Sequence, residues 1–164
     1  MKKLFLLTLV MMGFSSILFA QTSATADAAA TIIEPISIAK VTDLNFGDVA
    51  VGAGGGTVVM LATDASRTVT GDCSLPGTGT ITRASFTVTG VDAETYAITL
   101  PVGVTTIDDN AGHTMTVDTW TSSPTPTGVL DQTLYVAGTL HVNGTQFQGV
   151  YNADTDFTVT VAYN

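Results

Sequence analysis

The segment from Phe157 to Tyr163 alternates strictly between large apolar side chains and Thr or Ala. Successive side chains of a β-strand point to opposite faces, so this segment predicts a strand with one buried and one exposed face. Shorter segments of the same period occur at 32–38, 86–90, 96–100, 115–117, 134–136 and 140–142. The 3.6-residue period of an amphipathic helix is missing outside the N-terminal 20 residues, so the pattern favours β-structure.

Gly, Pro, Asn and Asp separate these segments at intervals of about ten residues, the spacing of strands in a sandwich or a barrel. Composition supports this, since the chain has 30 Thr while charged residues make up only 12% of it. The β-branched Thr side chain favours strands. We therefore predict an all-β chain with one domain over residues 31–164. The expected architecture is an antiparallel β-sandwich, immunoglobulin-like or pilin-like, with roughly 7–10 short strands and no helix after the leader.

Residues 1–20 have the layout of a secretory signal peptide. A positive start with Lys2 and Lys3 precedes an apolar run, and Ala20 supplies a small residue for cleavage. Cleavage after Ala26 is the alternative. The apolar stretch 4–19 is shorter than the ~20 residues that span a bilayer, and no later apolar run follows it. We expect export to the periplasm, cell surface or medium, no membrane span after cleavage, and a flexible lead-in over residues 21–30.

The formal net charge is −9, with 14 acidic residues. Without the two leader lysines only Lys40, Arg67 and Arg83 oppose them, which leaves −11. Such a body repels nucleic acid, so no nucleic-acid partner is expected. Cys73 is the only cysteine, so the chain has no internal disulfide. A buried thiol and an intermolecular bridge both remain open for it.

Several short motifs are better explained by turns than by chemistry. Residues 75–79 read L-P-G-T-G, the pattern that sortases cleave, but a strand-rich segment follows where a membrane anchor would have to stand. Four glycines in residues 52–56 lack the Lys and the helix of a phosphate-binding loop, so we expect an ordinary loop. Asn143-Gly144 predicts a two-residue type I′ hairpin, although Asn143 also begins a formal glycosylation sequon.

No catalytic, cofactor-binding or metal-binding residue is assigned. His113 and His141 are the only histidines, and neither has a metal-ligand partner at short spacing, so both are expected to be solvated. Oxygen side chains at alternate positions suit calcium, but the two candidate clusters lack the loop Gly and the bidentate Glu of a tight site. These clusters, expected to be turns, are Asn152/Asp154/Asp156 and Asp108/Asp109/Asn110. No cofactor is expected, and without a nucleophile–base pair the chain is not expected to be an enzyme.

The order of the strand segments resembles a known family. The segments are Ile36-Ser-Ile38, Leu44-Asn-Phe-Gly47, Gly56-Thr-Val58, Phe86-Thr-Val-Thr-Gly90, Tyr96-Ala-Ile-Thr-Leu-Pro101, Gly138-Thr-Leu140, Gly149-Val-Tyr151 and Phe157–Tyr163. Together they are similar to the bacterial secreted domain of unknown function four-four-zero-two, over essentially the whole chain after the leader. That family has no established catalytic residues, so the resemblance implies none here.

A second, weaker likeness is to chaperone–usher pilus subunits, which end in an alternating strand with a penultimate tyrosine, as Tyr163 does. Those subunits borrow a strand from a neighbour, and residues 21–38 resemble such a donor. Two departures are the missing cysteine pair and Glu34, which interrupts the apolar face of the donor. The likeness implies copies of this chain as partners, joined through the N-terminal segment.

Two functions remain open from the sequence. One is an exported structural or adhesive cell-surface protein, including a pilin-like subunit that assembles by strand addition. The alternative is an exported module that binds a glycan or another surface ligand, for which Trp120, beside the Pro124 and Pro126 stretch, could stack on a sugar. Core packing is the ordinary role of a single Trp.

Overall fold

The computed structural model describes residues 21–153 and 156–164. The predicted signal peptide, residues 1–20, lies outside the described residues. The chain divides into two units, Met1–Ile32 and Ile33–Asn164. Residues 21–32 are exposed and carry no strand, and no helix occurs anywhere in the described ranges. In particular, no described helix is long and apolar enough to cross a membrane.

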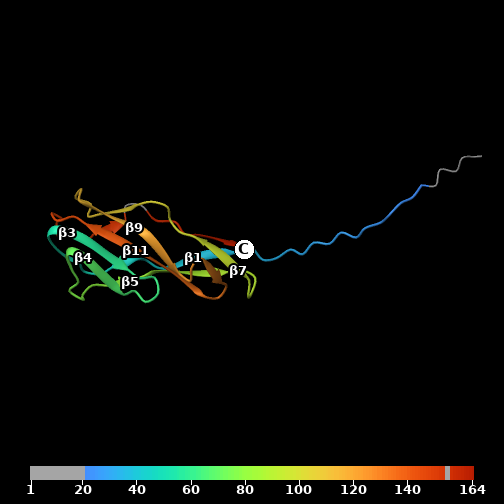
Figure 1. Cartoon of the computed structure of the whole chain (residues 1–164), viewed down its shortest axis with the longest axis horizontal. Coiled ribbons are helices and arrows are strands. Elements are labelled where there is room, and N and C mark those ends of the chain that lie inside the picture. The colour runs from blue at the N-terminus through green and yellow to red at the C-terminus, as the bar shows by residue number, and fades with distance from the viewer. Residues whose placement is uncertain (1–20, 154–155) are drawn as a thin grey trace, which may run out of the picture. The chain divides into compact units, whose positions relative to one another are not determined.

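The unit Ile33–Asn164 consists of antiparallel strands joined by turns (Figure 1). The strands are β1 (Ser37–Thr42), β2 (Asn45–Phe46), β3 (Ala50–Met60), β4 (Arg67–Ser74), β5 (Ile81–Thr82), β6 (Ala84–Thr89), β7 (Thr95–Thr99), β8 (Thr105–Asp108), β9 (Thr114–Ser123), β10 (Thr127–Val129), β11 (Thr133–Val142), β12 (Asn152–Ala153) and β13 (Thr160–Tyr163). Nine of these described strands have four or more residues, and the others are short pairings at the margins.

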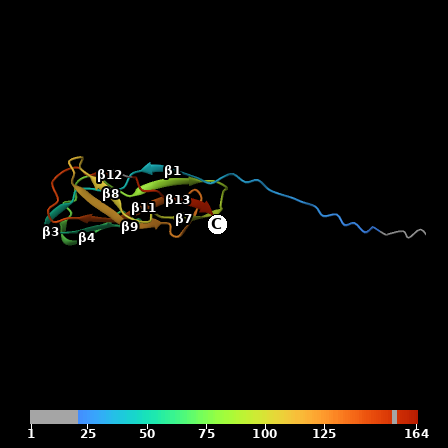
Figure 2. The ribbon, with the colours of Figure 1, turned by 90° about the horizontal axis from the view of Figure 1, so that it is seen from above.

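The strands form one large sheet and two small ones. The large sheet has the order β1-β6-β11-β9-β8-β12, with β3 and β4 joined to it through β11. The three-stranded sheet has the order β10-β7-β13, and β2 pairs with β5. Figure 2 shows β3 and β4 toward one end of this unit and β7 and β13 toward the other. The predicted all-β, sandwich-like fold is confirmed.

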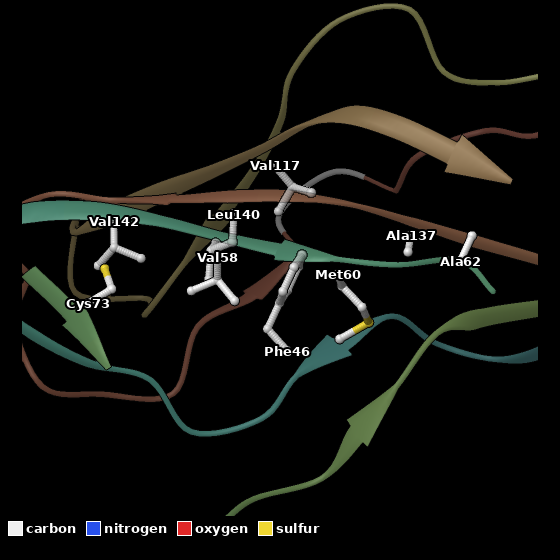
Figure 3. Close-up of a cluster of buried hydrophobic side chains, with 9 residues drawn as sticks. All are labelled: Phe46, Val58, Met60, Ala62, Cys73, Val117, Ala137, Leu140 and Val142. Atoms are coloured by element: carbon white, nitrogen blue, oxygen red, sulfur yellow. The ribbon is translucent and has the colours of Figure 1, made fainter. Parts of the chain in front are cut away.

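Two buried clusters hold the layers together. In the first, side chains of β3, β9 and β11 meet Phe46 of the β2–β5 pair (Figure 3). In the second, Leu134 and Val136 of β11 and Val88 of β6 pack with Tyr96 of β7. Residues of β11 belong to both clusters, so this strand is the centre of the fold. The small sheets therefore cover the two ends of one face of the large sheet.

The buried face predicted for the closing segment, Phe157–Tyr163, is confirmed. Val159 is buried at 8% exposure, Phe157, Val161 and Tyr163 pack against the same core, and the residues between them are exposed. Only its second half is paired, because β13 begins at Thr160, opposite Thr99 of β7. The first half is extended and pairs with no described strand.

The glycine run at 52–56 is not a loop, as the sequence suggested, but lies within β3. The β3–β4 register shifts between Val51 and Gly56, so the run forms an irregularity in the ladder. Gly55 has φ +68°, and the amide of Gly54 donates to the Asp72 carboxylate at 2.8 Å. A Cβ at these positions would clash with neighbouring segments, so glycine lets the backbones of β3 and its neighbours approach closely. A run of glycines is also typical of loops, which is why the sequence alone suggested one.

The predicted hairpin at Asn143-Gly144 is wrong. The amide of Gln146 donates to the Asn143 carbonyl in an ordinary turn, and the following strand, β12, pairs with β8. Both edges of β11 are already occupied, one by β9 and the other by β6 and β3. A returning strand thus has no edge to pair with. Gly144 is instead required by packing, since a Cβ there would lie 1.9 Å from the Ala53 carbonyl oxygen.

Residues 32–38, the first segment with the period of a strand, are exposed in their first part and packed against the core in their second part. Ser37–Thr42 pairs with β6 as an ordinary first strand, and Ile36 and Ile38 pack against the second core cluster of their own domain. Just before them, the Tyr163 hydroxyl donates to the Glu34 carbonyl at 2.9 Å and accepts from the Val91 amide at 2.8 Å. The part of the predicted donor that stays outside the core therefore ends before Ile36.

Candidate binding groove and histidine pairs

His113 is not simply solvated. Its Nδ1 lies 2.5 Å from Oδ2 of Asp109, and its ring stacks on Phe147 with centroids 4.0 Å apart. Asp109 Oδ1 also accepts the amides of Ala111 and His113. These contacts close the connection between β8 and β9. The predicted turn holds for Asp109 and Asn110, whereas Asp108 is the last residue of β8. The Asp109 side chain is only 9% exposed, so the pair is a structural brace of the hairpin.

The contacts of Asp109 predict acid sensitivity. The hydrogen bond from His113, assisted by the amides of Ala111 and His113, lowers the pKa of the Asp109 carboxyl from 3.8 to about 2. A folded-state pKa below the unfolded value contributes stability above the unfolded pKa, and that stability is lost as the pH falls through the folded pKa. We expect melting temperature to fall between pH 4 and 2, and to fall less steeply in Asp109→Asn. Parallel acid-melting curves for the two proteins would contradict this role.

His141 also has an acidic partner. Its Nε2 lies 2.8 Å from Oδ1 of Asp118, which further accepts the Thr119 hydroxyl at 2.9 Å. The His141 contact, followed by that of Thr119, lowers the pKa of the Asp118 carboxyl. His141 lies on β11 and Asp118 on β9, 23 residues apart. Only the pairing register brings them together, whereas the four-residue spacing of Asp109 and His113 was a local signal in the sequence.

The two pairs do not form a metal centre or a catalytic triad. In the described part of the chain, no three His, Cys, Asp or Glu side chains gather as metal ligands. Asp154 of the predicted calcium-like cluster lies outside the described residues. Asn152 of that cluster is not the predicted turn residue, because it lies in β12 and pairs with Asp108 of β8.

Cys73 and the L-P-G-T-G segment both have structural roles. Cys73 is 7% exposed in the first core cluster, and burial raises the pKa of its thiol, as expected for a buried thiol. The Thr78 hydroxyl donates to Asp48 at 2.6 Å, and Gly77 and Gly79 have positive φ angles. The segment is a turn between β4 and β5.

The Lys and Arg side chains within residues 21–153 and 156–164, which the structure describes, also make contacts inside the fold. Arg83 donates to the carbonyls of Ala62 and Thr63 and lies over the Tyr135 ring, 3.5 Å from its centroid. Arg67 donates to the Phe46 carbonyl, and Lys40 pairs with Asp43. These contacts form no basic patch.

A groove of about 390 Å³ opens beside the start of β13. One wall is the β7–β8 connection, residues 99–105, and the other is the extended segment before β13, residues 156–160. The first wall is apolar from Leu100 to Val104, and the second wall presents Phe157 between Asp156 and Thr158. Val102 is fully exposed, and Val104 is 61% exposed. The groove has no local signal in the sequence, because its two walls lie far apart along the chain and meet only in the folded domain.

Trp120 contacts residues of both walls of the groove. It lies in β9, so the predicted loop begins only after Ser123. Its ring packs against Phe157 at a centroid distance of 4.4 Å, and its indole N–H donates to the Gly103 carbonyl at 3.2 Å. It also contacts both core clusters. The packing role is confirmed, and Trp120 joins the two walls of the groove to the large sheet.

The domain that carries the groove matches a known family. A family described as Domain of unknown function (DUF4402) matches residues 36–163. Comparison with curated proteins and with solved structures gives no match. The family match begins one residue before β1 and ends with the last residue of β13. The chain therefore belongs to the DUF4402 family.

Proposed function

We propose that this protein is an exported, non-enzymatic structural or adhesive component of the cell surface, and that copies assemble through their N-terminal segments. The observation that carries the proposal is an apolar segment without a strand partner, placed directly before an edge strand. Residues 21–36 form no strand. Within this segment the side chain of Ile32 is 97% exposed and that of Ile33 is 55% exposed. Covering these two adjacent side chains would remove apolar surface from water, which favours a contact with another surface.

The sheet edges support the same proposal. β1 ends the large sheet and β13 ends the three-stranded sheet. An edge strand presents unpaired N–H and C=O groups, which a neighbouring chain can satisfy by adding a strand. The described histidines each pair with one carboxylate, an arrangement that braces turns and strands and offers no nucleophile. A structural role thus agrees better with these contacts than catalysis does.

Export is the first expectation of this proposal. The protein recovered from the periplasm or the medium should begin at Gln21, or at Asp27 if the second cleavage site is used. Intact-mass spectrometry of the released protein distinguishes the two. Release of a chain that still begins at Met1 would contradict export by a cleaved signal peptide.

Self-association through the N-terminal segment is the second expectation. Burying one isoleucine contributes roughly 1.5–3 kcal/mol, so Ile32→Asp should weaken association by about 10–100-fold. The measurement is sedimentation or size exclusion of the exported chain over a concentration series. Thr31→Asp, which adds the same charge to the same segment at a polar position present after either cleavage, is the control and should associate normally. A wild-type chain that stays monomeric throughout would refute assembly.

A further inference from the structure

We infer that Asp118 and His141 form a latch, which holds a strained β-bulge in β9 and so keeps Trp120 against the groove. The latch lies on the outer face of the large sheet, the face turned away from the two core clusters. The Trp120 ring packs on the inner face, so the bulge couples the two faces of the sheet. This coupling acts within one chain and does not depend on assembly.

β9 contains one residue more than the strand with which it pairs. The β9–β11 register shifts so that residues 119–120 of β9 oppose Gly138 alone. Such a β-bulge changes the face to which the following side chains point. A Cβ built on Gly138 would meet the side chains of Val117 and Trp120, each at 3.2 Å. Val117 and Trp120 therefore share the inner face, although a spacing of three residues would separate them in a regular strand.

The bulge is unfavourable at two positions. Thr119 has φ +50° and is the only β-branched residue with a positive φ in the described part of the chain. A β-branched side chain crowds the backbone in this conformation. Ser122 is 6% exposed, and its Oγ is buried without a hydrogen-bond partner. If β9 slipped by one residue after Asp118, residue 119 would be extended and Ser122 would point to the outer face, so both penalties would be removed.

Backbone pairing alone holds this part of β9 weakly. β8 pairs with β9 only from Thr114 to Val117, and after Val117 the single described partner of β9 is β11. A slip there breaks one set of ladder hydrogen bonds instead of two. Side chains must therefore contribute to fixing the bulged register.

Side chains do so on both faces. On the outer face, Asp118 Oδ1 accepts the Thr119 hydroxyl at 2.9 Å and lies 2.8 Å from Nε2 of His141. The first contact fixes the strained residue, and the second ties the bulge to β11. On the inner face, the ring and the indole N–H of Trp120 contact the two walls of the groove. Loss of the Asp118 carboxylate thus releases the bulge and lets Trp120 turn away from the groove.

The test uses Trp120, the only tryptophan of the chain. In the full chain labelled with fluorotryptophan, each environment of this ring gives its own fluorine resonance, and saturation transfer detects a minor form in slow exchange. Asp118→Ala should raise the ratio of outward to inward Trp120 about 10–100-fold, because it removes hydrogen bonds to a charged group. The minor resonance should show the solvent isotope shift of an exposed ring. Asp43→Ala, which removes the carboxylate paired with Lys40, is the control and should change nothing.

Substitutions of Thr119 test the strain that the latch opposes. Thr119→Val removes the hydroxyl and keeps the β-branch, so it should also raise the minor form in a chain that retains Asp118. Thr119→Gly adopts a positive φ without strain, so adding it to Asp118→Ala should return the minor form to its wild-type level. A minor form that stays raised in this double variant would overturn the opposition between latch and strain. Equal spectra of the wild type, Asp118→Ala and Thr119→Val would overturn the latch itself.

Discussion

Val159→Asp is expected to lower the free energy of unfolding by about 3–5 kcal/mol, because it buries a carboxylate without a partner. Val159 is 8% exposed and belongs to the cluster that contains Tyr96 and Leu134. For a domain of this size the loss corresponds to a fall in melting temperature of roughly 10 °C or more. Thermal unfolding followed by circular dichroism measures it.

The matched control for this change is Thr158→Asp. It introduces the same side chain one residue earlier, where the strand face is exposed. A surface substitution of this kind should change the stability by no more than about 0.5 kcal/mol. Equal melting temperatures for the two variants would mean that the register of the closing segment is wrong.

Gly56→Ala is expected to destabilise the β3–β4 pair by about 3 kcal/mol. A Cβ at this position would lie 2.1 Å from the Thr70 carbonyl oxygen and 2.9 Å from the Cys73 sulfur. The first of these is backbone of the paired strand, so relief requires that the two strands separate. Chemical denaturation measures the loss, and increased reactivity of the Cys73 thiol would accompany it.

Gly77→Ala separates this close packing from ordinary backbone strain. Gly77 has φ +79°, and nothing lies within 4 Å of a Cβ built there. Only the left-handed conformation is penalised, by about 1 kcal/mol. If Gly56→Ala were as mild as Gly77→Ala, the glycine-rich segment would not be in close contact with β4.

The groove was hidden from sequence for a specific reason. The segment 157–163 reads as one continuous strand, and its buried face is indeed continuous. Its pairing is not, since the partner β7 ends at Thr99 and Pro101 follows soon after. Side-chain period reports which face is buried, whereas hydrogen-bonded pairing depends on a second segment far away in sequence. A gap in the hydrogen-bonded pairing of a strand therefore does not change the alternation of apolar and polar residues in its sequence.

The sequence by itself determined the fold class, the buried face of the closing segment and the membership of a domain family, because these follow from local period and from the order of segments. The cleaved leader that the sequence indicates stays a prediction. Tertiary structure alone decided the rest. The glycine run lies in β3, and His141 lies beside Asp118. Asn143-Gly144 forms no hairpin, because both edges of β11 are already paired. The physical reason is that a strand acquires its neighbours through burial and pairing over long sequence separations, and the residues of one strand do not encode which edge is still free.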